Sequence, residues 1–190
     1  TRLYHEQLSS FAPLPVVMRT LDIGGDKDLP YFPINEANPF LGWRGIRVTL
    51  DHPEVLMVQM RAMLMASREL DNLRILLPMI TSVDEVDTAL RLLARARQEL
   101  AEDGIEVASP KVGVMIEVPA TLYQLSALAE RVDFFSVGSN DLTQYLLAVD
   151  RNNARVASLY DACHPAVLNA LARLAEESQR LGVPASVCGE

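Results

Sequence analysis

The sequence predicts an α/β fold built on a parallel sheet, and three observations support that prediction. Short apolar segments rich in β-branched and aromatic residues alternate with longer amphipathic segments of helical periodicity. Proline and glycine stand at several ends of the helical segments, where they commonly begin and terminate helices. Strand and helix alternating at this spacing are typical of βαβ units, and the pattern fits both a doubly wound sheet and a barrel.

The elements follow one another in a regular order. The predicted buried strands cover residues 15–23, 73–80, 111–118, 132–138 and 184–188. The predicted helices between them cover residues 53–70, 82–102, 119–131 and 165–181. The helix at 82–102 opens with the capping-box pattern Ser82-Val-Asp-Glu85, and the helix at 165–181 is followed by Gly182. The longest irregular segment, 24–42, is long enough to be a functional loop.

Bulk composition limits the function classes. The chain has 190 residues, of which 49% are hydrophobic, so we expect one packed unit rather than a disordered chain. A net charge of −8 argues against nucleic acid or an anionic membrane as a partner. Two cysteines and the lack of a long apolar run favour a soluble, cytoplasmic protein. The predicted strands are fewer than the eight of a complete barrel, and both ends of the chain look cut, so we expect truncation at both ends.

Unusual polar residues stand at the carboxyl ends of the predicted strands. Glu117 ends one strand, Asn140 and Asp141 follow the next, and Cys188 ends the last. Asp22 follows the first strand in the same way. Because the active site of a β/α barrel is built at this end of the strands, we expect these side chains to meet on one face.

Glu117 and Asp141 are candidate ligands of a divalent metal. Both follow strongly apolar segments, where an ionised carboxylate needs a partner. Mg²⁺ takes one or two protein carboxylates together with substrate oxygens. The alternative, a structural salt bridge from either carboxylate to an arginine, is equally compatible with the sequence.

Arginines could supply an anion site beside these carboxylates. Arg19 lies inside a predicted buried strand, so it must find an anion, and Arg44 and Arg151 stand near other motifs. Arg47 is more simply explained as a solvated helix residue. Cys188 could exchange a proton with a substrate, although free cysteines are most often small buried hydrophobes.

Several segments carry family signatures. They are RTLDIGGDK at 19–27, NPFLGWRGIR at 38–47, GVMIEVP at 113–119, DFFSVGSNDLTQ at 133–144, AVDR at 148–151 and CGE at 188–190. Together they resemble the phosphoenolpyruvate–protein phosphotransferase, Enzyme I of the bacterial phosphotransferase system. Ser139 and the segment 146–153 look more like the nitrogen-related branch than the sugar-transport branch of that family.

The resemblance implies a fold and a set of roles. It implies that residues 1–190 form a partial TIM-like (β/α)8 barrel, the domain of a phosphoenolpyruvate (PEP)-utilising enzyme, without the N-terminal phosphohistidine domain. The residues implied to bind PEP are Arg19, Arg44, Asn140, Asp141 and Arg151. Glu117 and Asp141 would bind Mg²⁺, Cys188 would protonate the enolpyruvate carbon, and Lys27 would assist near the phosphate.

The resemblance also implies an activity and partners. The parent enzyme would be a kinase-like transferase that moves the phosphoryl group of PEP to a protein histidine, releases pyruvate, and serves a phosphocarrier of the HPr type as a homodimer. We expect the chain alone to be inactive. Two alternatives stay open: an assembly module without activity, and a domain of a pyruvate phosphate dikinase or PEP synthase.

Overall fold

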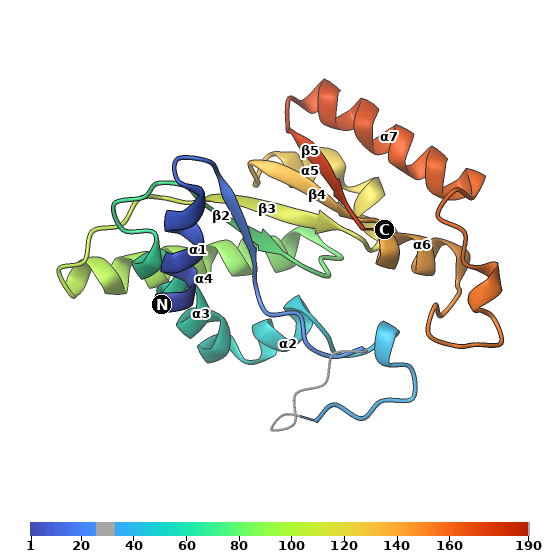
Figure 1. Cartoon of the computed structure of the whole chain (residues 1–190), viewed down its shortest axis with the longest axis horizontal. Helices are drawn as coiled ribbons and strands as arrows, with labels where there is room; N and C mark the ends of the chain where they lie inside the picture. Colours follow the sequence, from blue (N-terminus) through green and yellow to red (C-terminus); the bar gives the residue numbers. More distant parts are fainter. Residues whose placement is uncertain (26–32, 190) are drawn as a thin grey trace.

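The computed structural model describes residues 1–25 and 33–189, and its centre is a curled parallel sheet of five strands (Figure 1). The strands are β1 (Val16–Arg19), β2 (Leu73–Leu77), β3 (Lys111–Ile116), β4 (Phe134–Gly138) and β5 (Ala185–Cys188). They lie side by side in sequence order, and each pairs in parallel with the next. A doubly wound sheet reverses its strand order at a switch point, whereas a barrel keeps it. The uninterrupted order therefore identifies part of a barrel.

The helices form an outer layer on this sheet. They are α1 (Arg2–Phe11), α2 (Ile46–Asp51), α3 (Pro53–Ala66), α4 (Val83–Glu102), α5 (Leu125–Ala129), α6 (Ser139–Leu147) and α7 (Pro165–Leu181), with short 3-10 turns η1 (Pro39–Leu41), η2 (Pro119–Tyr123) and η3 (Ala157–Leu159). Helices α3, α4, α5 and α7 pack against one another in that order. This sequence of contacts fits right-handed crossovers that place successive helices on one side of the sheet. Within the described ranges, no helix has the length and apolar character needed to cross a membrane.

All five predicted strands and three of the four predicted helices are present. The expectation that every strand is buried is wrong for β5, whose four residues are all exposed, and for most of β1, because these two strands lie at the edges of the described sheet. The predicted capping box is confirmed at the start of α4, where the Glu85 carboxylate accepts the backbone N–H of Ser82 at 3.0 Å. Helix α7 ends at Gly182, which has a left-handed backbone with φ of 69°.

The helix predicted at 119–131 is wrong as a single element. It is divided into η2 and α5, because Gln124 lies between them outside helical geometry, with φ of −125° and ψ of 11°. Helices α1, α2 and α6 lie outside the four predicted helix ranges. Helix α6 begins directly at the end of β4, so its first turn delivers Asn140 and Asp141 to the edge of the sheet.

The two faces of the sheet bury different clusters. The large core lies between the sheet and the helices and includes Ile75 and Val114 from the strands. Leu76, Met115 and Phe134 form a small separate cluster. Successive strand residues point to opposite faces, so this cluster marks the concave, inner face. Arg19 is paired in register with Leu76 and therefore lies at the carboxyl end of the same inner face.

Candidate functional site

A cavity of about 170 Å³ lies at the carboxyl edge of the sheet, and we call it the carboxyl-edge cavity. Its lining residues are Arg19, Met115, Glu117, Gly138, Asn140, Asp141, Arg151, Cys188 and Gly189. Strands β1, β3, β4 and β5 all contribute, either through their own ends or through the residues that follow them. The parallel order of the strands brings these residues together, because all carboxyl ends meet at one edge.

The cavity gathers nearly every predicted site residue. Arg19, Glu117, Asn140, Asp141, Arg151 and Cys188 line it. Arg44 does not line the cavity and lies behind Asp141. Lys27 and Glu190 lie outside the described residues.

Glu117 is a buried carboxylate, only 2% exposed. Its Oε1 accepts the backbone N–H of Met79 at 2.6 Å. Met79 lies in the left-handed backbone region with φ of 57°, which is uncommon for a residue other than glycine. Gly138 leaves room for this carboxylate, because a Cβ at position 138 would lie 2.8 Å from Glu117 Oε2.

The electrostatic surroundings of Glu117 favour a cation. Burial, and to a smaller extent the negative charges of Asp141 and Asp22, raise the pKa of Glu117 to about 7, against the opposing effects of the Met79 N–H and the charge of Arg44. A carboxyl group raised in this way becomes a better anion as soon as a positive charge arrives beside it.

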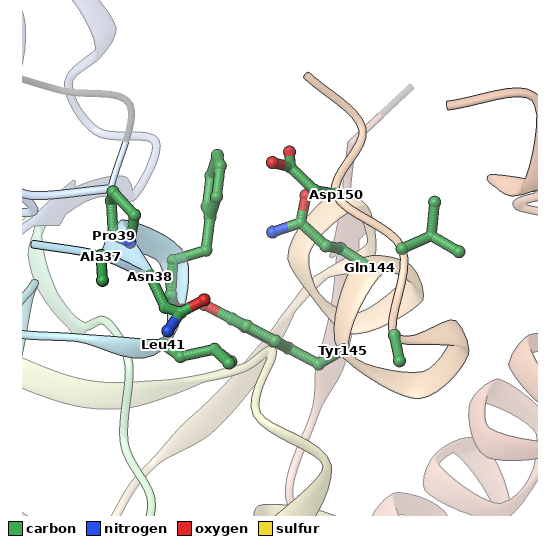
Figure 2. A pocket seen from close by; sticks show the side chains of 10 residues that line it. Ala37, Asn38, Pro39, Leu41, Gln144, Tyr145 and Asp150 are labelled. Atoms are coloured by element: carbon green, nitrogen blue, oxygen red, sulfur yellow. The ribbon is translucent and has the colours of Figure 1, made fainter. Parts of the chain in front are cut away.

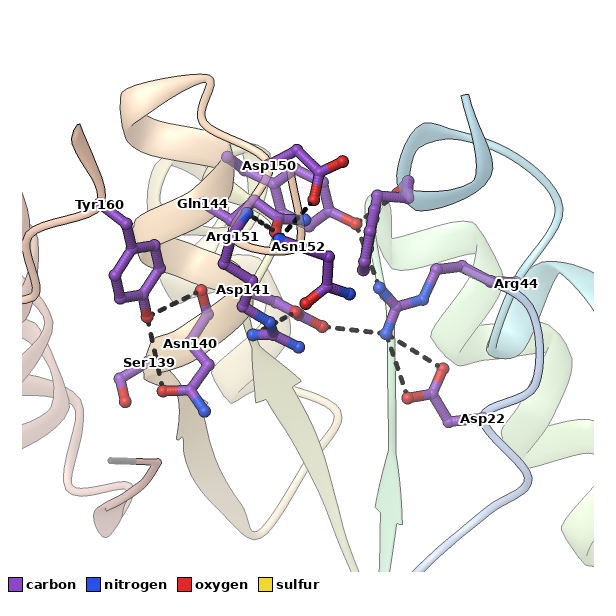
Figure 3. A network of polar contacts seen from close by, with 12 residues as sticks. Asp22, Arg44, Ser139, Asn140, Asp141, Gln144, Asp150, Arg151, Asn152 and Tyr160 are labelled. Atoms are coloured by element: carbon purple, nitrogen blue, oxygen red, sulfur yellow. Dashed lines mark hydrogen bonds and ion pairs between the residues drawn. The ribbon is translucent and has the colours of Figure 1, made fainter. Parts of the chain in front are cut away.

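Three arginines and two aspartates form an alternating chain of ion pairs. Figure 3 shows its members from Asp22 to Arg151. Arg19 Nη1 lies 3.2 Å from Asp22 Oδ2, and Arg44 Nη2 lies 3.2 Å from the same oxygen. Arg44 Nη2 also lies 2.9 Å from Asp141 Oδ2. Arg151 Nη1 completes the chain at 3.1 Å from Asp141 Oδ1. Asp141 therefore forms the salt bridges that were the alternative to metal binding, and it also lines the carboxyl-edge cavity.

Arg44 is completely buried at 0% exposure. Burial alone would lower the pKa of its guanidinium, but Asp22 and Asp141 reverse that effect and hold the pKa above its ordinary value. Its Nη1 donates to the hydroxyl of Tyr145 at 3.4 Å. The guanidinium is thus held on two sides by carboxylates and on a third by a phenol.

Arg19 differs from its predicted environment. The prediction placed it in the middle of a buried strand, but it is the last residue of β1, an edge strand of the described sheet, and its side chain is 38% exposed. The anion it was expected to need is Asp22, three residues later. Arg47, expected to be solvated, donates to the carbonyl oxygen of Gly42 at 2.8 Å and so holds the end of η1.

Cys188 lies at the end of β5, as predicted, and its thiol lines the cavity. Its Sγ donates to the carbonyl oxygen of Val137 at 3.1 Å. Ser136 Oγ lies 3.6 Å from the same sulfur. Gly189 follows in a left-handed conformation, where a Cβ would collide with Ser139 Oγ, so only glycine fits there.

Three further side chains support the site: sequence reasoning placed Asp22 there without giving it a partner, and it missed Tyr145 and Tyr160. Asp22 joins Arg19 to Arg44, Tyr145 contacts Arg44, and the hydroxyl of Tyr160 donates to the carbonyl oxygen of Asn140 at 3.3 Å. The spacing of Asp141 and Tyr145 was an available signal, because residues four apart share one helix face. Nothing in the local sequence pointed to Tyr160.

A second cavity of about 330 Å³ lies next to the site, between η1 and the end of α6 (Figure 2). Phe40, Leu41, Tyr145 and Val149 supply much of its apolar wall, and the carboxylate-bearing Asp150 also lines it. The ring of Tyr145 lines this cavity while its hydroxyl reaches Arg44, so one side chain borders both the second cavity and the ion-pair chain.

Comparisons with known proteins agree with this geometry. The family model described as PEP-utilising enzyme, PEP-binding domain, matches residues 1–190. A protein of Escherichia coli K12 named "Phosphoenolpyruvate-dependent phosphotransferase system" is 57% identical over 188 residues, which is 98% of this chain and 25% of that protein. A "Phosphoenolpyruvate-protein phosphotransferase" of Geobacillus stearothermophilus is 43% identical over 189 residues, 98% of this chain and 32% of that protein. The chain therefore spans only a quarter to a third of the length of these relatives.

A solved structure supports the fold alone. A citrate lyase from Burkholderia xenovorans LB400 superposes with a TM-score of 0.52 at 23% identity, over 70% of this chain and 39% of that chain. At this level of similarity the shared feature is the arrangement of strands and helices, and function has to be argued from the site.

Proposed function

Because the chain belongs to the family of PEP-utilising enzymes, as a PEP-binding domain that matches over residues 1–190, we propose that it binds phosphoenolpyruvate in the carboxyl-edge cavity. The bound PEP would donate its phosphoryl group to a protein histidine and leave as pyruvate. The observation that carries this proposal is the meeting of Arg19, Arg151, Glu117 and Cys188 around one cavity.

The cations of the cavity suit the two anionic groups of PEP. Guanidinium groups bind phosphate and carboxylate through paired hydrogen bonds. Arg19 and Arg151 both line the cavity, and each is held from behind by an aspartate. Asn140 lines it as well, with its backbone carbonyl tied to Tyr160. These residues would fix the substrate, and phosphoryl transfer depends mainly on such positioning and on charge neutralisation.

The carboxylates fit a divalent cation. Glu117 and Asp141 line the cavity, and Gly138 leaves space beside Glu117 Oε2. Within the described part of the chain, no group of three or more His, Cys, Asp or Glu residues is placed to hold a metal. Mg²⁺ suits such a sparse set, because it keeps waters and takes substrate phosphate oxygens as its remaining ligands. When bound, Mg²⁺ would neutralise charge on the transferring phosphoryl group.

Cys188 would act as the acid of the reaction. When the bond between phosphorus and the enolate oxygen breaks, the enolate carbon must gain a proton to become pyruvate. The thiol of Cys188 would give that proton to carbon and become a thiolate, and its donation to Val137 O would be released in the same step. Loss of the hydrogen bond from the thiol to Val137 O costs little, because a thiol is a weak donor.

The wider setting is part of the same proposal. The whole protein would serve a phosphocarrier of the HPr type, act in the cytoplasm and form a homodimer. The nitrogen-related branch is proposed over the sugar-transport branch on Ser139 and the segment 146–153 alone.

Calorimetric titration of PEP in the presence of Mg²⁺ tests the proposal. We expect the wild-type protein to bind PEP and the Glu117→Gln variant to lose the Mg²⁺-dependent part of that binding. Glu99→Gln is the matched control, because Glu99 of α4 pairs with Arg61 of α3 and Arg95 of α4, away from the cavity, and it should bind as wild type. Mg²⁺-dependent binding that is unchanged by Glu117→Gln would refute the metal assignment, and no binding by the full-length wild type would refute the function.

A further inference from the structure

Arg44 poses a structural question for the proposed function. It is 0% exposed, and its Nη2 is shared between Asp22 and Asp141. If Asp141 serves a metal ion, less of its charge is available to Arg44. The guanidinium then depends on its other neighbours to stay in place beside the cavity.

One of those neighbours is the neutral side chain of Tyr145, whose hydroxyl both accepts and donates a hydrogen bond. The Tyr145 hydroxyl accepts from Arg44 Nη1 at 3.4 Å and donates to the carbonyl oxygen of Phe40. The ring of Phe40 lies with its centroid 6.0 Å from the guanidinium carbon of Arg44, so the same contact also holds an aromatic face near the cation.

The position of Tyr145 on α6 explains how it reaches Arg44. Asp141 and Tyr145 are four residues apart on one helix, so both side chains project from the same face. Figure 3 shows the result: Arg44 lies opposite this face of α6, with Asp141 at one end of its guanidinium group. Two contacts from a single rigid helix fix the guanidinium more precisely than two contacts from separate loops would.

Tyr145 also connects Arg44 to the segment before it. Phe40 lies in η1, which ends at Leu41, and Arg44 comes three residues after that end. The Tyr145 hydroxyl therefore links α6 both to the side chain of Arg44 and to the turn that precedes Arg44 in the chain.

From these contacts we propose that Tyr145 is a positioning residue for Arg44, through which α6 holds this arginine and η1 in the arrangement that PEP binding requires. The proposal rests on the proposed function, because Arg44 would act on PEP binding by holding Asp141, which lines the carboxyl-edge cavity. Tyr145 would not touch the substrate. It would act through Arg44 and through the carbonyl of Phe40.

The Tyr145→Phe variant tests the proposal, because it removes one oxygen and keeps the ring that lines the second cavity. We expect the KM for PEP in the full-length protein to rise by about tenfold, with kcat changed by no more than about twofold, since a hydrogen bond to a charged group contributes on this scale and acts here on binding. Tyr123→Phe is the matched control. Tyr123 is 76% exposed and outside both cavities, so the same change there should leave KM as in wild type.

A double-mutant cycle separates positioning from general structure. In the Arg44→Lys background, Tyr145→Phe should raise KM by less than about twofold, because the residue it acts through is already altered. Effects that multiply fully in the double variant would overturn the proposal, and so would a Tyr145→Phe variant with wild-type KM. The calorimetric titration of wild-type protein with PEP is done first. If the wild type does not bind PEP, the proposed function fails, and this outcome is distinct from a failure of the Tyr145 proposal.

Discussion

Arg44 and Asp141 are 97 positions apart in the sequence, and their side chains meet at 2.9 Å between Nη2 and Oδ2. Arg44 is fully buried and Asp141 nearly so. Buried charges are tolerated when they are paired and hydrogen-bonded, and here Asp22 and Tyr145 complete the pairing. The pair joins the segment after β1 to the helix after β4, so it ties the two sides of the site together.

Removal of the Arg44 guanidinium should therefore destabilise the folded protein strongly. Arg44→Leu would leave Asp22 and Asp141 buried without their shared cation, and we expect the free energy of unfolding to fall by about 3–5 kcal/mol. Chemical denaturation of the ligand-free protein measures this. Arg61→Leu is the control, because Arg61 pairs with Glu99 and Asp103 near the surface, and its loss should matter much less. Equal effects of the two variants would contradict the role given to the buried pair.

Glu117 should make stability depend on pH. Its pKa is raised from an ordinary value of 4.5 to about 7 in the folded state, so the folded protein binds the proton more tightly than the unfolded chain. This contribution to stability is present in full below about pH 4.5 and is lost as the pH rises through about 7, at a cost of roughly 3 kcal/mol. Glu117→Gln should remove this loss, so the variant should gain stability relative to wild type at pH 8 but not at pH 4. Parallel pH profiles for the two proteins would contradict the assignment.

Gly138 should be required for the conformation of Glu117. A Cβ at this position would lie 2.8 Å from Glu117 Oε2 and 3.0 Å from its Cβ. We expect Gly138→Ala to displace the carboxylate and to weaken Mg²⁺ binding at least tenfold in a calorimetric titration, since overpacking of this kind typically costs about 1–3 kcal/mol. In the Glu117→Gln background the same substitution should change Mg²⁺ binding no further. A second loss of equal size there would mean that Gly138 acts elsewhere.

Cys188 should affect the rate of the reaction more than the affinity for substrate. In the full-length protein, Cys188→Ala should slow pyruvate formation by about 100-fold or more while the KM for PEP stays close to wild type, because a general acid acts in the transition state. Cys163→Ala is the matched control, since Cys163 is an exposed cysteine outside the cavity. If affinity falls and the rate per bound substrate does not, the thiol is a packing residue.

Much of the fold could be predicted because the information is local. Apolar runs, Pro53, Gly182 and the Ser82 to Glu85 pattern each act within a few residues, and the elements they indicate are present. The break at Gln124 was missed because the periodicity of 119–131 continues through it, although the backbone there leaves helical geometry.

The sequence by itself determined the order of the elements and placed Glu117, Asp141 and Cys188 at strand ends, because hydrophobic periodicity specifies where each strand stops. Only the tertiary structure decided that the strands keep their sequence order, that Arg19 stands at an edge, and that Arg44 is enclosed by Asp22, Asp141 and Tyr145. The physical reason is distance along the chain. Contacts between segments far apart depend on how the strands assemble, and no local pattern of residues specifies which charges will be buried against one another.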